Sequence, residues 1–224
     1  LLLLLLGKRG RKRGHDDESL RGKEQHHLVL VERPLHLHVS QDERLGVGIA
    51  TEADARRWIL SSPEAYCNTT DAEVLKQILP SFDQETADFF RWRVEYTREE
   101  LERIVGKKSG IDFGTIMDLV PLQRGPSGRI IRLKIVGTKK VIVVGKELEV
   151  RRWLSNSHLY SSAFVVDAER DRDGVPTGFT LRGAGWGHGV GLCQIGAAVM
   201  AARGKKAEEI VLHYFPGARV GKLY

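Results

Sequence analysis

The sequence has few of the residues and spacings from which several common functional sites are built. Its 224 residues include two cysteines, Cys67 and Cys193, and no C-x-x-C pair, which excludes a zinc ribbon and a thioredoxin-type motif. No stretch fits G-x-G-x-x-G or G-x-x-x-x-G-K-[ST], so neither glycine-rich nucleotide cradle is present. The leucine run at residues 1–6 is too short for a transmembrane helix.

The first 28 residues carry many charges and no apolar period, so we expect them to be disordered. A basic run there can bind nucleic acid or anionic lipid, but it is also common in unstructured tails, and we expect no nucleic-acid partner. The run consists of Lys8, Arg9, Arg11, Lys12 and Arg13. A signal peptide places basic residues before its apolar stretch, whereas here the leucines come first. They are either the end of an upstream signal or membrane anchor, or a misplaced start of the reading frame.

Histidines are concentrated near the start of the chain. Their spacing fits no known ligand pattern, and the segment lacks a core to hold a metal, so we expect neither a metal site nor a cofactor. These residues are His15, His26, His27, His36 and His38.

Residues 29–224 are expected to form one α+β domain with a mainly antiparallel sheet and short helices. "FFRWRVEYT" alternates apolar and polar residues, as a half-buried antiparallel strand does. "TEADARRWILSSP" predicts a helix capped by Thr51, and "TREELERIVGKKSG" one capped by Thr97 and closed by Gly106. "GPSG" predicts a tight hairpin, and no βαβ repeat is present.

Between residues 183 and 191 every second residue is glycine, in the stretch "GAGWGHGVG". On a strand this pattern gives one face of bare backbone and another that carries Ala184, Trp186, His188 and Val190. Each ordered glycine costs about 0.5–1 kcal/mol relative to alanine. We therefore expect either that something lies against the backbone or that the dihedral angles forbid a Cβ atom. A purely structural interpretation, in which a glycine-rich bend is packed under a helix, is compatible with either explanation.

The pattern after Gly191 becomes helical and strongly apolar, and predicts a helix buried on nearly every side. Its one interior polar side chain is Gln194, which is either hydrogen-bonded to backbone within the core or faces a cleft together with His188. Trp186 beside them can stack on the apolar face of a sugar ring. Cys193 has no paired base, and we expect an inert thiol there.

The segments "GWGHGVGLCQIGA" and "ARGKKAEEIVLHYFPGARV" resemble the C-terminal signature of the sporulation stage II protein D family, also called the LytB amidase-enhancer family. Upstream, "RGPSGRIIRLKIVG", "KELEVRRWL" and "LYSSAFVV" are similar to further blocks of that family, so the resemblance covers residues 124–224. It implies a cell-envelope protein, periplasmic or extracellular, that acts on peptidoglycan. Glycan-binding residues are expected at Arg124, Ser127, Trp186, Gly187, His188, Gly189 and Gln194.

The resemblance leaves three hypotheses about activity. The family's catalytic glutamate lies in an E-M-P segment followed by an A-x-A-A-R-T-Y-A helix, and neither is present here, so the chain looks like an N-terminally truncated lytic transglycosylase that binds glycan strands without cleaving them. Alternatively, it is a non-enzymatic activator or partner of a cell-wall amidase. In the third hypothesis Glu147 or Asp167 replaces the missing acid. Cys193 and Ile195 stand where the family frequently has Ser and Tyr.

Overall fold

The structure is a computed structural model that describes residues 27–30, 49, 51–78 and 90–222. The expectations about the basic run and the early histidines concern residues or side chains outside this description. The first described strand begins at His27, just inside the segment expected to be disordered.

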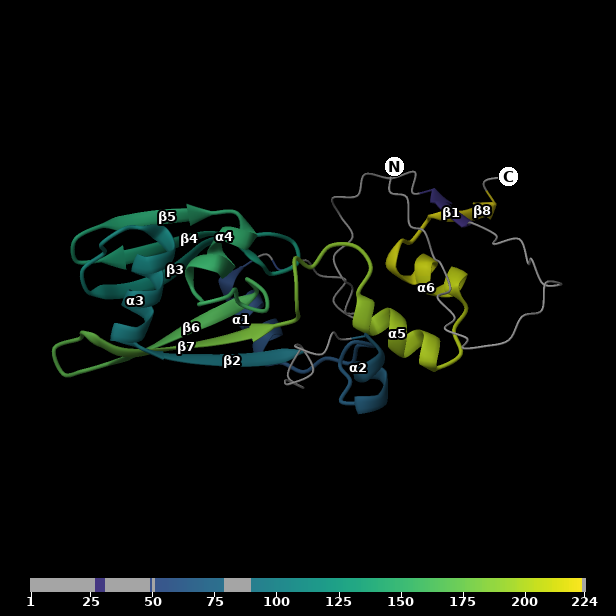
Figure 1. Cartoon of the computed structure of the whole chain (residues 1–224), viewed down its shortest axis with the longest axis horizontal. Helices are drawn as coiled ribbons and strands as arrows, with labels where there is room; N and C mark the ends of the chain where they lie inside the picture. The colour runs from purple at the N-terminus through teal and green to yellow at the C-terminus, as the bar shows by residue number, and fades with distance from the viewer. Residues whose placement is uncertain (1–26, 31–48, 50, 79–89, 223–224) are drawn as a thin grey trace, which may run out of the picture.

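Two three-stranded antiparallel sheets form most of the fold (Figure 1). The first has the order β2-β7-β6, with β2 at Arg91–Thr97, β7 at Pro176–Ala184 and β6 at Phe164–Arg170. The second has the order β3-β4-β5, with β3 at Ile116–Arg124, β4 at Ile130–Gly137 and β5 at Val141–Gly145. A short pair joins β1 (His27–Leu30) to β8 (Arg219–Lys222).

Six helices accompany these strands in the described part of the chain. They are α1 (Glu52–Leu60), α2 (Ala72–Ile78), α3 (Arg98–Ser109), α4 (Glu147–Trp153), α5 (Gln194–Ala202) and α6 (Ala207–Tyr214). The predicted α+β class with antiparallel sheets is therefore confirmed. None of the helices within the described ranges combines the length and apolar character needed to cross a bilayer.

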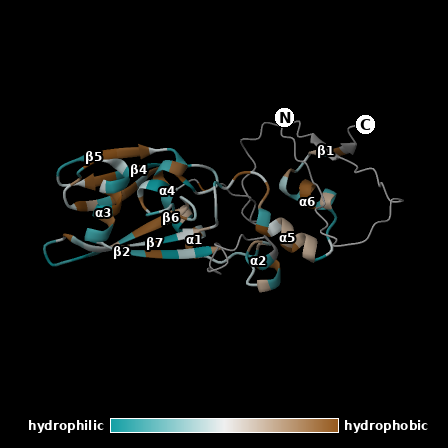
Figure 2. Cartoon of the chain, in the orientation of Figure 1, coloured by the Kyte–Doolittle hydropathy of each residue, from teal (hydrophilic) through white to brown (hydrophobic). Residues whose placement is uncertain are grey.

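One hydrophobic core joins both three-stranded sheets to α3 and α4. Strands β4 and β5 are largely apolar in Figure 2, and the inward-facing residues of β4 are almost completely buried. The alternation in β2 places Trp92 in this core, where its ring lies 6.2 Å from that of Phe164. The shared core fixes the two sheets relative to each other, because removing either would expose the other's apolar face.

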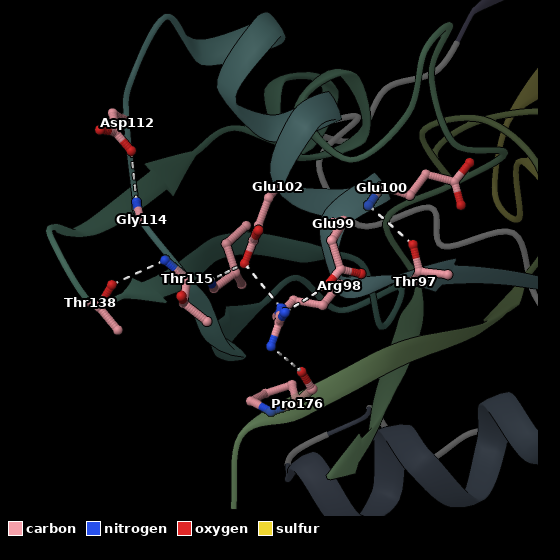
Figure 3. Close-up of polar contacts among 11 residues, drawn as sticks. Thr97, Arg98, Glu99, Glu100, Glu102, Asp112, Gly114, Thr115, Thr138 and Pro176 are labelled. Carbon is pink, nitrogen blue, oxygen red and sulfur yellow. Dashed lines mark hydrogen bonds and ion pairs between the residues drawn. The ribbon is translucent and has the colours of Figure 1, made fainter. Parts of the chain in front are cut away.

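Helix α3 follows β2 directly, and its polar side chains contact strands of both three-stranded sheets (Figure 3). Thr97 Oγ1 accepts a hydrogen bond from the Glu100 amide at 3.2 Å, as the predicted N-cap requires. Arg98 donates to the carbonyl of Pro176 on β7, and the Glu102 carboxylate accepts from the Ile116 amide on β3. These contacts hold the start of the helix at the junction of the sheets.

The helix begins where the sequence predicts but ends later. Gly106 lies inside α3, and the C-cap is Gly110, whose φ of 71° is the left-handed conformation that ends helices. The prediction that Gly106 closes the helix is wrong.

The remaining helices divide between two groups. Ala55 and Ile59 of α1 pack on β6 and β7 residues of the first sheet, whereas α2, α5 and α6 lie together beyond the end of the sheets (Figure 1). A second cluster of buried residues forms between α5, α6 and the chain that follows them. The segment that contains the alternating glycines leads from β7 across to α5 (Figure 1). Its conformation therefore decides what is displayed between the two groups.

Candidate functional site

The alternating glycines form a loop rather than a strand. Strand β7 ends at Ala184, so the expected strand with one bare face does not continue through the glycines. In the glycine loop, residues 185–191, the φ angles of Gly185, Gly187, Gly189 and Gly191 are 68°, 75°, 71° and 85°. The residues between them are outside this left-handed region. Left-handed backbone costs other residues about 1–2 kcal/mol each, so the period of two comes from alternating backbone handedness.

The first half of the glycine loop is fixed to the sheets by its own backbone. The Gly185 amide donates to the Phe90 carbonyl at 3.0 Å, and the Gly185 carbonyl accepts from Trp92 Nε1 at 3.1 Å. The Gly187 amide donates to the Tyr160 carbonyl at 2.8 Å. Paired backbone groups of this kind hold an irregular segment in one conformation.

Arg129, the residue immediately before β4, contacts the glycine loop through its side chain, and our sequence analysis did not single it out. Its side chain is 5% exposed, and Nε donates to the Gly187 carbonyl at 2.8 Å while Nη1 donates to the Ser127 carbonyl at 3.4 Å. Burial lowers the pKa of Arg129 to about 10, and the nearby Glu147 carboxylate opposes this shift. The guanidinium is therefore charged at neutral pH. The sequence signal that could have indicated its burial is the position of Arg129 between the "GPSG" turn and the apolar residues of β4.

Five of the seven predicted site residues lie on the glycine loop or in the first turn of α5, and three of these five carry functional side chains. Trp186 is half-buried, with its ring 5.1 Å from that of Tyr160 at an angle of 67°. His188 is exposed, and so is Gln194, the first residue of α5. The loop thus places an indole, an imidazole and an amide along one short stretch of chain, with the glycines Gly187 and Gly189 between them.

Helix α5 is buried on one side and not on nearly every side. Gly196, Val199 and Met200 are buried, and Met200 belongs to the cluster that α5 forms with α6, whereas Ala201 is exposed. The prediction of an interior Gln194 is therefore wrong. Small residues on the outer side make the helix apolar in composition without requiring burial.

Arg124 and Ser127 take supporting positions. The Arg124 side chain is 6% exposed, forms an ion pair with Glu52 on α1, and donates to the carbonyls of Gly128 and Phe164 at 2.8 Å. Ser127 is buried next to Arg129, to which its carbonyl is hydrogen-bonded. The structure therefore connects Ser127 to the glycine loop through Arg129, and ties Arg124 to α1 and β6.

The two carboxylates considered as replacement acids are both held by arginines. Glu147 lies 3.4 Å from Arg151, and Asp167 lies 2.9 Å from Arg56 and 3.6 Å from Arg182. A general acid must have a proton that it can donate to the substrate, and both of these carboxylates are occupied as ion-pair partners of arginines. Within the ranges that the structure describes, no three His, Cys, Asp or Glu side chains are grouped as a metal site would require.

Cys193 follows the glycine loop and is the N-cap of α5, so it does not lie inside the helix. Its sulfur accepts a hydrogen bond from the Gly196 amide at 3.4 Å. A hydrogen bond from Cys67, together with the amides of the first turn and the charge of Arg129, lowers the pKa of Cys193 to about 7 despite burial. A lowered pKa at a helix N-terminus favours the thiolate, which is the form of cysteine that reacts.

Comparison with known proteins places this architecture in a family. Residues 39–191, which include both three-stranded sheets and the whole glycine loop, match the domain of unknown function DUF8618. The chain belongs to the DUF8618 family. The matched region begins well before the blocks at residues 124–224 on which the sequence resemblance depends.

This DUF8618 protein is also related to a sporulation protein. It is 36% identical over 160 residues to stage II sporulation protein D of Bacillus amyloliquefaciens, an alignment that covers 71% of the chain and 41% of that relative. The predicted relationship to the stage II protein D family is thereby confirmed. The chain spans less than half of the length of this relative.

Proposed function

We propose that the chain binds glycan strands of peptidoglycan in the cell envelope through the glycine loop and the start of α5. The observation that carries this proposal is the position of Trp186 and His188 on a loop whose backbone is bonded to Trp92 of β2 and to Arg129 just before β4, with Gln194 following at the start of α5. The relationship to stage II sporulation protein D supports a role connected with the cell wall.

The chemistry of the three side chains suits a sugar polymer. Sugar rings have apolar faces that pack on aromatic rings, and Trp186 offers the largest such ring. The hydroxyl and amide groups of an amino sugar need both donors and acceptors, which His188 and Gln194 supply. Because the loop is already ordered, binding does not require its backbone to lose further conformational entropy.

We further propose that this chain does not itself cleave the glycan. A lytic transglycosylase needs a carboxylic acid that donates a proton to the glycosidic oxygen. Glu147 and Asp167, the two replacement candidates, are both engaged by arginines. The catalytic step would then depend on residues that the matched region does not contain.

Co-sedimentation of the purified chain with insoluble peptidoglycan tests the binding proposal. We expect Trp186→Ala to weaken binding by about tenfold or more, as loss of an aromatic contact residue does. Trp186→Phe should retain most of the binding. Val143→Ala, at an exposed position on β5, is the matched control and should bind as the wild type does. Equal sedimentation of the wild type and Trp186→Ala would refute a glycan site at the loop.

Two further readouts separate the remaining hypotheses. Mass spectrometry of the digested glycan should show no anhydro-muramyl ends, and their appearance would overturn the proposed lack of cleavage. If they appear, Glu147→Gln and Asp167→Asn identify the acid. Capture of a cell-wall amidase by a chain without glycan affinity would instead favour the amidase-activator hypothesis.

A further inference from the structure

The two cysteines meet where the chain crosses between the sheets and the C-terminal helices. Cys67 lies between α1, which packs on the first sheet, and α2, which lies beside α5. Cys193 lies between the glycine loop and α5, as the N-cap of that helix. The Cys67 thiol donates a hydrogen bond to the Cys193 sulfur, and both side chains are half-buried. The cysteine pair therefore joins the segment between α1 and α2 to the segment between the glycine loop and α5.

Packing around Tyr66 holds Cys67 at this position. The Tyr66 ring lies 5.4 Å from that of His213 on α6, and the Arg203 guanidinium lies 5.4 Å from the Tyr66 ring. A Cβ atom built on Gly196 would lie 3.5 Å from Tyr66 Cβ, so the two backbones approach closely. Because Tyr66 is packed against α5 and α6, its neighbour Cys67 is held close to the start of α5. Formation of an S–S bond of about 2.05 Å requires the two sulfurs to approach from hydrogen-bond contact.

The chemistry of the pair is asymmetric. Cys193 occupies the N-terminus of α5, where free amides and the positive end of the helix stabilise a thiolate. With a pKa of about 7 it is substantially ionised near neutral pH. Cys67 is the hydrogen-bond donor of the pair, and its sulfur lies where it can attack a disulfide formed on Cys193.

We propose that Cys67 and Cys193 are a redox-active dithiol that forms an intramolecular disulfide by exchange with an external disulfide. The Cys193 thiolate attacks one sulfur of that disulfide, which forms a mixed disulfide and releases one thiolate. Cys67 then loses its proton to the released thiolate and attacks the Cys193 sulfur, which forms the Cys67–Cys193 bond and releases a second thiolate. One protein thiol and one protein thiolate are oxidised to a disulfide, and one external disulfide is reduced to one thiol and one thiolate, which takes its proton from solvent.

The disulfide would fasten the second end of the glycine loop. Its first end is already bonded to the sheets through Gly185 and Gly187. Cys193 follows the last glycine of the loop closely, so a covalent bond to Cys67 limits the movement of the other end. This inference does not rest on the proposed function and holds whether or not the loop binds glycan.

Thiol trapping in glutathione buffers of increasing oxidised fraction tests the proposal directly. The purified reduced chain is equilibrated, quenched with acid, and labelled with a maleimide-polyethylene glycol reagent for gel and peptide mass analysis. We expect both thiols to disappear together and a linked Cys67–Cys193 peptide to appear in a monomeric band. Two labelled thiols under oxidising conditions, glutathione adducts alone, or only intermolecular dimers would each overturn the proposal.

Single substitutions provide matched controls for the contact itself. The serine in Cys193→Ser can still cap α5. Under oxidising conditions, Cys193→Ser and Cys67→Ser should each bind one glutathione at the remaining cysteine and form no intramolecular disulfide. In the reduced protein, the pH at which alkylation of Cys193 is half-maximal should rise by about one unit in Cys67→Ala. It should rise less in Cys67→Ser, whose hydroxyl still donates. Identical midpoints in the wild type and Cys67→Ala would show that the two thiols are not in contact.

Discussion

The substitution Gly189→Ala tests whether Arg129 supports the glycine loop. Two effects add at this position. The φ of 71° costs a residue with a Cβ atom about 1–2 kcal/mol. The new methyl group would also overlap the Arg129 guanidinium, with Nε 2.6 Å away. Since that side chain is 5% exposed, it can move only by breaking its hydrogen bonds, and overpacking of this kind costs about 1–3 kcal/mol. We expect a total loss of about 2–5 kcal/mol.

The same loop provides the control. Gly187 has a φ of 75°, and a Cβ atom there would meet nothing within 4 Å. Gly187→Ala therefore introduces only the backbone strain and should lower the free energy of unfolding by about 1–2 kcal/mol. Urea denaturation followed by tryptophan fluorescence measures both free energies of unfolding in the reduced protein. If the two variants lose equal stability, the packing of Arg129 against the loop does not contribute as described.

Three further predictions concern buried groups near the loop. Gly183→Ala should lose about 2–4 kcal/mol of unfolding free energy, because its Cβ atom would overlap the Trp92 ring, whose Cη2 is 2.6 Å away; a near-neutral result would contradict the packing of β7 on β2. Arg129→Lys should lose about 1–3 kcal/mol, since one ammonium cannot reproduce the guanidinium fork; wild-type stability in urea would show that charge alone suffices. Because the pKa of Cys193 falls from 9.0 to about 7 on folding, the stabilisation that it gives the reduced chain is complete above about pH 9 and is lost as the pH falls through 7. The wild type should therefore gain about 1–3 kcal/mol over Cys193→Ser between these pH values, and a constant difference would refute the depressed pKa.

Much of the fold follows from local sequence signals. The cap of α1 forms as predicted, with Thr51 Oγ1 accepting from the Asp54 amide at 3.1 Å. The "GPSG" turn joins β3 to β4, and the Gly128 amide bonds to the Gly125 carbonyl. In these elements the chemistry of a few neighbouring residues determines the conformation, so a single sequence contains the information.

The candidate site is harder to predict because alternating glycines have two physical explanations. A strand with a bare face and a loop of alternating handedness produce the same letters, and only the φ angles distinguish them. The burial of Arg129 depends on carbonyls of Gly187 and Ser127, which are far apart in sequence from each other. The proximity of Cys67 to Cys193 likewise arises from the path of the chain and not from a local pattern.

The chemistry of arginine explains why this residue type stands at position 129, where it contacts the glycine loop. Burying a charge is unfavourable, and an apolar side chain would fill the same space at lower cost. An apolar residue, however, leaves the Gly187 carbonyl without a donor, and a lysine supplies one point charge in place of a planar fork. Arginine satisfies a carbonyl of the loop and a carbonyl of the β3–β4 turn with different nitrogens of one rigid group. The buried guanidinium therefore links the Gly187 carbonyl of the loop to the turn before β4, and this link fixes the backbone that carries Trp186 and His188.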